Sequence, residues 1–168
     1  MTPPVPYAPG VIVPASNGAG PRLQIIDRPV GLDNAQVHLV DDVETAGEFL
    51  RWLSTRDVVG FDTESTGIDV DVDRVRMVQF GDDRHGWAIP FERWGGVVVT
   101  AVARYNGIYV AHNSPFDYRL CQREGIVLPQ HKMRNTRMMA HVLSSTTPLA
   151  LKSLATQYVD SRAAVGQQ

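Results

Sequence analysis

The sequence predicts a single α/β domain, in which helices pack on the faces of a mixed β-sheet. Short apolar runs typical of buried strands alternate with stretches whose apolar residues recur at helical spacing. Three of the expected strands follow one another with only turn residues between them, which favours an antiparallel meander. The chain has 168 residues, 43% of them hydrophobic, so it is long enough for one core and too short for two ordinary domains.

A proline-rich arm is expected over residues 1–35, ahead of a domain over 36–168. The first 30 residues hold 7 of the 11 prolines and only three charged side chains. Because proline fixes φ and lacks the N–H group that a helix interior needs, this composition favours extended segments.

In the first half of the domain, strands are expected over 37–40, 57–64, 75–80 and 87–91, and the last three of them form the meander. Between the first two strands, Asp41-Asp42 opens a helix, because the apolar residues that follow recur on one helical face.

The second half of the domain alternates helices with a strand. Ser114 as N-cap, Pro115 at the first helical position and Asp117 three residues after the cap predict a capping-box-like helix start, and Gly125 ends that helix. The other expected elements are a helix over 97–105, a strand over 108–111, and helices that start at Asn135 and at Thr147-Pro148.

Composition excludes membrane-spanning and disulfide-stapled classes. No stretch approaches the roughly 18 consecutive apolar residues that span a bilayer, and the first residues lack the pattern of a signal peptide. The single cysteine, Cys121, cannot form an internal disulfide, which suits a reducing compartment. A cytoplasmic protein is therefore expected.

Charge is unevenly distributed, although the net charge is only −2. Residues 27–103 carry 15 acids and 7 bases, whereas residues 104–168 carry 3 acids and 8 bases. The basic half is compatible with a nucleic-acid partner. Four arginines are candidates for a phosphate-facing patch, with ordinary solvated side chains as the alternative: Arg119, Arg123, Arg134 and Arg137.

Two acidic features lie at positions where functional residues are common in α/β sheets, a strand end and a helix N-terminus. Asp62 and Glu64 are two residues apart at the end of a strand, so both carboxylates point to one face, with Cα atoms about 6–7 Å apart. Asp117 lies at a helix N-terminus just beyond another strand. Together they suit hard divalent cations such as Mg²⁺. The alternatives are two solvated acids and an ordinary helix cap.

These residues resemble the motifs of a known family. Residues 61–67, Phe-Asp-Thr-Glu-Ser-Thr-Gly, resemble the first exonuclease motif of the DEDD superfamily, and 112–117, His-Asn-Ser-Pro-Phe-Asp, resemble the second. Segments 135–143 and 149–155 look like the ones that follow in that family. The similarity covers about residues 36–160 and looks closest to the proofreading domain of family A DNA polymerases, particularly phage ones, which implies a ribonuclease H-like fold.

The resemblance implies a 3′-5′ exonuclease that hydrolyses the phosphodiester at a single-stranded DNA 3′ end with two ions of Mg²⁺ or Mn²⁺. By this resemblance Asp62, Glu64 and Asp117 would be the catalytic, metal-binding carboxylates. Ile68 would be a wedge against a base, with an ordinary core isoleucine as the alternative. The residues that fall where the family contacts the terminal nucleotides are Ser65, Ile68, Asn113 and Phe116.

Two departures from the family pattern bear on activity. A fourth acid on a late helix, in Tyr-x-x-x-Asp or His-x-x-x-x-Asp, is absent, and the only acids after Asp117 are Glu124 and Asp160. Asn135 stands where the family usually has aspartate. The resemblance therefore predicts a C-terminally incomplete domain that is a weak or inactive nuclease by itself, with a polymerase domain or a second chain as a source of the missing acid.

Two other interpretations stay open. One is a catalytically silent module of the same fold that binds nucleic acid or a protein, and the other is ribonuclease D-like trimming of RNA 3′ ends. A zinc protein is not expected, because four of the histidines show no ligand spacing with cysteine or with one another: His38, His85, His131 and His141.

Overall fold

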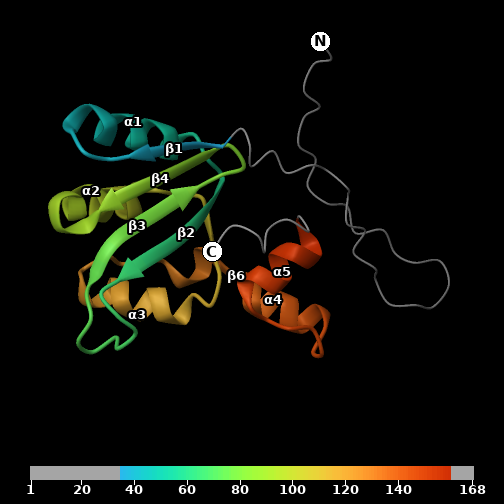
Figure 1. Cartoon of the computed structure of the whole chain (residues 1–168). Helices are drawn as coiled ribbons and strands as arrows, with labels where there is room; N and C mark the ends of the chain where they lie inside the picture. Colours follow the sequence, from blue (N-terminus) through green and yellow to red (C-terminus); the bar gives the residue numbers. More distant parts are fainter. Residues whose placement is uncertain (1–34, 160–168) are drawn as a thin grey trace, which may run out of the picture.

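The computed structural model describes residues 35–159, which build one six-stranded mixed sheet with the strand order β1-β4-β3-β2-β5-β6 (Figure 1). The antiparallel pairs β2–β3 and β3–β4 confirm the predicted meander, and β5 lies parallel to β2. The strands are β1 (Gln36–Leu39), β2 (Val58–Ser65), β3 (Val75–Gly81), β4 (His85–Pro90), β5 (Ile108–Ala111) and β6 (Met133–Asn135).

Two further parallel pairings form the two edges of the sheet. β1 pairs with β4, and β6 pairs with β5. The pairing of β1 joins segments that are far apart in the sequence, so no local pattern could predict it. β6 was not predicted as a strand, because three residues are too few to show an alternation of apolar and polar side chains.

The helices connect the strands and flank the sheet. Among the helices of residues 35–159, none has both the length and the apolar character needed to cross a membrane. The helices are α1 (Val43–Ser54), α2 (Phe91–Arg104), α3 (Pro115–Arg123), the 3₁₀ helix η2 (Gln130–Lys132), α4 (Thr136–Leu143) and α5 (Leu151–Tyr158).

Local capping explains where two of the helices begin. The Asp42 side chain accepts a hydrogen bond from the Thr45 N–H, and the Thr45 hydroxyl oxygen accepts one from the Asp42 N–H, so α1 starts with a capping box. The Asn135 side chain accepts from the backbone N–H groups of Arg137 and Met138 and caps α4. Both starts were predicted.

The predicted start of α3 is confirmed, with Ser114 as N-cap and Pro115 as the first helical residue, but the Ser114 side chain makes no capping hydrogen bond and Asp117 bonds to Thr63 instead. The predicted starts of two other helices were wrong. Helix α2 begins at Phe91, directly after β4 and six residues before its predicted start, with a kink at Trp94. Helix α5 begins at Leu151, later than Thr147. The proposed arm lies outside the described residues except for residue 35, so it stays a prediction.

The core lies between the sheet and the helices α1, α2 and α3, and Figure 1 shows α1 and α2 next to β1, β4 and β3. Its centre is aromatic: the ring of Phe49 on α1 lies 5.1 Å from that of Phe80 on β3 and 5.7 Å from that of Trp87 on β4. Burial of these rings supplies much of the free energy that holds α1 on the sheet. The opposite face of the meander carries Asp62 and Glu64, which are exposed.

Gly107, between α2 and β5, is expected to tolerate no larger side chain. An added Cβ atom would lie 2.5 Å from the Asp57 carbonyl oxygen and would also collide with the Tyr105 hydroxyl. We expect Gly107→Ala to destabilise the fold by about 1–3 kcal/mol, as overpacking does. Gly96→Ala on α2 is the matched control, because nothing lies within 4 Å and alanine favours helix. Urea denaturation measures the stability of both variants. Equal denaturation midpoints for Gly107→Ala and Gly96→Ala would contradict the prediction.

Candidate functional site

Two of the predicted carboxylates project from the same face of β2. In this strand Val59, Phe61 and Thr63 are buried, so Asp62 and Glu64, which alternate with them, face outward. On the neighbouring strand β3, Gln79 pairs in register with Asp62, and its amide nitrogen lies 3.5 Å from the Glu64 carboxylate. This end of β2 therefore presents two acids on one surface, as their spacing predicted, and β3 adds an amide that was not predicted.

The third predicted acid, Asp117, lies in the first turn of α3 and is only 4% exposed. The Thr63 hydroxyl donates a 2.6 Å hydrogen bond to its carboxylate. Because the Thr63 side chain faces the buried side of β2, this bond holds Asp117 across the strand from the two exposed acids, close enough for its charge to act on Asp62. The fold thus brings all three predicted carboxylates to one region, although they come from segments 53 residues apart.

Crowding of these acids shifts their protonation. Partial burial, together with the charges of Asp117 and Glu64, raises the pKa of Asp62 to about 6. Burial also raises the pKa of Asp117, and the Thr63 hydrogen bond offsets part of that rise. Like charges held this close favour either a shared proton or a bound cation.

The donor set suits a hard divalent cation such as Mg²⁺, because all three groups offer carboxylate oxygens and a cation would relieve their mutual repulsion. Within residues 35–159, however, no three His, Cys, Asp or Glu side chains already converge as one metal-binding group. Asp117 is held by Thr63 instead. Binding of one ion by all three acids therefore needs a change of side-chain rotamer.

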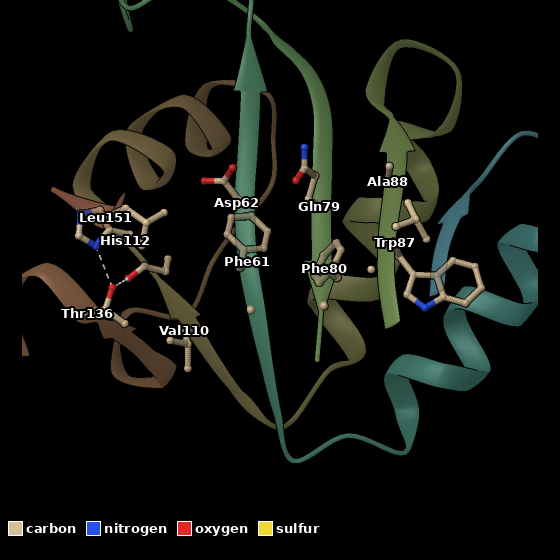
Figure 2. A pocket seen from close by; sticks show the side chains of 15 residues that line it. Phe61, Asp62, Gln79, Phe80, Trp87, Ala88, Val110, His112, Thr136 and Leu151 are labelled. Atoms are coloured by element: carbon tan, nitrogen blue, oxygen red, sulfur yellow. Dashed lines mark hydrogen bonds between the residues drawn. The ribbon is translucent and has the colours of Figure 1, made fainter. Parts of the chain in front are cut away.

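A cleft of about 570 Å³ extends from Asp62 across the outward face of the sheet (Figure 2). Figure 2 shows Asp62 and Gln79 side by side on adjacent strands, with His112 and Thr136 at the other side of Asp62. The His112 Nδ1 lies 2.9 Å from the Thr136 hydroxyl oxygen. No site role was predicted for Gln79, His112 or Thr136. The outward position of Gln79 in a meander strand was the only sequence signal for it.

None of the four predicted nucleotide-contacting residues lines the cleft. Ile68 is 91% exposed, which rules out the core alternative. Asn113 has a left-handed φ of 60° at the turn from β5 into α3, and its side-chain oxygen accepts from Arg137 at 3.3 Å. Phe116 is half-buried against the core. The Ser65 hydroxyl bonds to the Gly67 carbonyl within the turn.

The four arginines do not form one patch. Arg123 donates to the Asp73 carbonyl at 3.1 Å, and the guanidinium of Arg119 lies 4.0 Å from Asp71, so both hold the loop that follows β2. Arg134 donates to carbonyls in its own segment. Arg137 alone among the four bonds to a predicted substrate-contacting residue, Asn113. The predicted phosphate-facing patch is therefore reduced to Arg137.

Loss of the Thr63 hydroxyl is expected to leave Asp117 without its side-chain partner. A buried carboxylate that loses a hydrogen bond keeps its desolvation cost, so we expect Thr63→Val to destabilise the fold by about 1–3 kcal/mol at pH 7. Thr63→Ser keeps a hydroxyl and is the matched control, with a smaller loss. Guanidinium denaturation of the three chains checks this. Equal stability of the valine and serine variants would contradict it.

Asp62 is expected to make the fold less stable as pH rises. Its folded pKa of about 6 lies above the value near 3.9 of an unfolded chain, so the folded state binds the proton more tightly. Stability is then lost between about pH 4 and pH 6. Asp62→Asn should therefore raise the free energy of unfolding at pH 7.5 by about 1 kcal/mol, a value reduced for solvent screening, and leave it unchanged at pH 3.5.

Thermal denaturation at the two pH values tests the role of Asp62. Glu48→Gln on the exposed side of α1 removes the same charge away from the three acids and serves as the control. An equal gain in both variants at pH 7.5 would show that overall charge, and not the crowding at β2, sets the effect.

A matching sequence family and a phage relative show what the chain is similar to. A family model described as 3′-5′ exonuclease, that of DNA polymerase A, matches residues 37–168. The DNA polymerase DpoZ of Vibrio phage phiVC8 is 33% identical over 92 residues, which are 52% of this chain and 14% of the phage protein. The chain thus spans a small part of that polymerase.

Solved structures share the fold at low sequence identity. The catalytic core of RRP6 from Trypanosoma brucei superposes with a TM-score of 0.64 at 15% identity, over 76% of this chain and 35% of that one. RNase D from Escherichia coli gives 0.57 at 13% identity, over 74% and 33%. Brucella melitensis NrnC with bound Mg²⁺ gives 0.56 at 18% identity, over 74% and 60%. The ribonuclease H-like fold is confirmed, and the chain belongs to the 3′-5′ exonuclease family of DNA polymerase A.

Proposed function

We propose that this domain removes nucleotides from single-stranded DNA 3′ ends by metal-dependent hydrolysis, as the proofreading module of a DNA polymerase. The observation that carries the proposal is that Asp62 lies close to Asp117 and Glu64: burial, together with the charges of these two acids, raises the pKa of Asp62 to about 6. Acids that only cover a surface are spread apart by repulsion, whereas a cation site gathers them.

Asp62, Glu64 and Asp117 would hold two divalent ions, Mg²⁺ or Mn²⁺. Hard oxygen donors suit both ions, and the similar fold of NrnC has been solved with Mg²⁺. When bound, the ions would supply an activated water and neutralise the charge that develops on the leaving 3′ oxygen.

The chain's own residues would position the strand end. Exposed Ile68 presents an apolar surface on which a terminal base can stack, and half-buried Phe116 lies on the other motif. The side chains of Ser65 and Asn113 offer hydrogen bonds next to the acids. Arg137, bonded to Asn113, places one positive charge near the path of the phosphates.

A cleavage time course tests the proposal. The chain is incubated with a 5′-labelled single-stranded DNA oligonucleotide and Mg²⁺ or Mn²⁺, beside an Asp62→Ala chain. A ladder shortened from the 3′ end and lost in the variant is the expected result, at a low rate because the fourth acid is absent from residues 1–168. Addition of a polymerase domain or second chain that supplies this acid should raise the rate. A wild-type ladder equal to that of Asp62→Ala would overturn the proposal.

A matched RNA strand tests the second candidate, ribonuclease D-like trimming of RNA 3′ ends. The fold match to an RNase D and to the RRP6 catalytic core favours this candidate, although the sequence match is to a DNA polymerase. Faster shortening of RNA than DNA would support it. Binding of either strand without shortening would instead support the catalytically silent module. If the chain is phage-encoded, the proposed activity would take place in the host cytoplasm.

A further inference from the structure

Two histidines from distant parts of the sequence meet on the α1 side of the sheet. His38 on β1 and His85 on β4 are 47 residues apart, and the parallel pairing of these strands brings the His38 Nε2 to 3.2 Å from the His85 Nδ1. Both rings are half-buried. The sequence showed no ligand spacing between them, because strand pairing and not a local motif brings them together.

We propose that His38 and His85 bind one borderline-soft divalent ion, of the class of Zn²⁺, Ni²⁺ and Cu²⁺. With metal–nitrogen bonds of 2.0–2.1 Å at a tetrahedral angle, two imidazole nitrogens lie about 3.3–3.4 Å apart, close to the separation in the protein. The ion takes the place of the proton that the two nitrogens share, after a small rotation of the rings. Water fills the other coordination positions.

The surroundings hold the two rings in place for this ion. His38 stacks on Trp87, with ring centroids 4.3 Å apart, so its side chain is ordered before any ion arrives. The Asp82 carboxylate accepts the backbone N–H of His85 at 2.7 Å, which fixes the backbone at the start of β4. An ordered ligand pair binds more tightly than a flexible one, because less side-chain entropy is lost on binding.

This site differs in chemistry from the carboxylates of β2 and does not depend on their proposed role. Imidazole nitrogen suits zinc, nickel and copper, whereas Mg²⁺ prefers oxygen ligands. Millimolar Mg²⁺ should therefore leave the histidine pair free while it competes at the acids. Because His38 and His85 belong to different strands, the ion would fasten β1 to β4 and raise the thermal stability of the sheet.

Calorimetric titration of the untagged chain with Zn²⁺, in millimolar Mg²⁺, tests the site. We expect one ion per chain, with affinity lowered at least tenfold in His38→Ala and in His85→Ala. The exposed His131 and His141 provide the control variants His131→Ala and His141→Ala, which should bind as the wild type does. The double variant Asp62→Asn/Glu64→Gln should also keep the ion, which separates this site from the proposed nuclease site.

A second measurement on the wild-type chain covers the case in which His38→Ala fails to fold. Paramagnetic Ni²⁺ should broaden the imidazole NMR signals of His38 and His85 first, and should raise the melting temperature. Broadening of His131 or His141 ahead of the pair would overturn the proposal. Unchanged affinity in folded His38→Ala and His85→Ala chains would overturn it equally.

Discussion

Replacement of Phe49 by alanine is expected to destabilise the fold by about 3–5 kcal/mol, the cost of deleting a fully buried aromatic ring. Phe49 contacts the rings of Trp52, Phe80 and Trp87, so its loss opens a cavity between α1 and the meander. Domains of this size have a free energy of unfolding of about 5–15 kcal/mol, and this single change therefore removes a large fraction of it.

Urea denaturation followed by tryptophan fluorescence measures the Phe49→Ala effect, since two of the three contacted rings are tryptophans. Val43→Ala is the control on the same helix, because Val43 is 80% exposed and its truncation should cost less than about 0.5 kcal/mol. If Phe49→Ala lowered the free energy of unfolding as little as Val43→Ala does, the described packing of α1 against the sheet would be contradicted.

The strands of the central sheet could be predicted from the sequence because each has a recognisable local pattern. The run 57–64 begins as a short apolar stretch and turns polar at its end, and the turns on either side of 75–80 leave the meander as the simplest pairing. The outer pairings of β1 and β6 could not be predicted in this way, since each depends on a partner far along the chain. The early start of α2 at Phe91 was missed because Phe-Glu-Arg-Trp also fits a strand end.

In the site, too, local features could be predicted and contacts between distant segments could not. The period of two places Asp62 and Glu64 on one face without any knowledge of the fold, and the structure agrees. The predicted helix-capping role of Asp117 was wrong. Asp117 bonds instead to Thr63, which is 54 residues away, so local spacing could not indicate this contact. Gln79 joins the site through strand register alone. Local spacing thus predicts which groups carry the chemistry, and tertiary contacts determine how they are held.

Asp62→Asn is expected to lower the rate of 3′-end cleavage at least about a hundredfold while it makes the fold more stable at neutral pH. Loss of a group that merely orients a metal ligand costs about 10–100-fold, so loss of a ligand itself should cost no less. A hundredfold loss corresponds to about 2.7 kcal/mol of transition-state stabilisation. The gain in stability follows from removal of a charge that burial and the neighbouring charges of Asp117 and Glu64 disfavour.

The opposite signs of these two effects separate chemistry from folding. A variant that loses activity because it unfolds must also melt earlier, whereas Asp62→Asn should melt later than the wild type at pH 7.5. Metal binding gives a readout independent of turnover: Mg²⁺ or Mn²⁺ should raise the melting temperature of the wild type and of Glu48→Gln, and raise that of Asp62→Asn much less. If Asp62→Asn kept the full metal-dependent shift, Asp62 would not be a ligand. The crowding of acids at the end of β2 would then need another explanation.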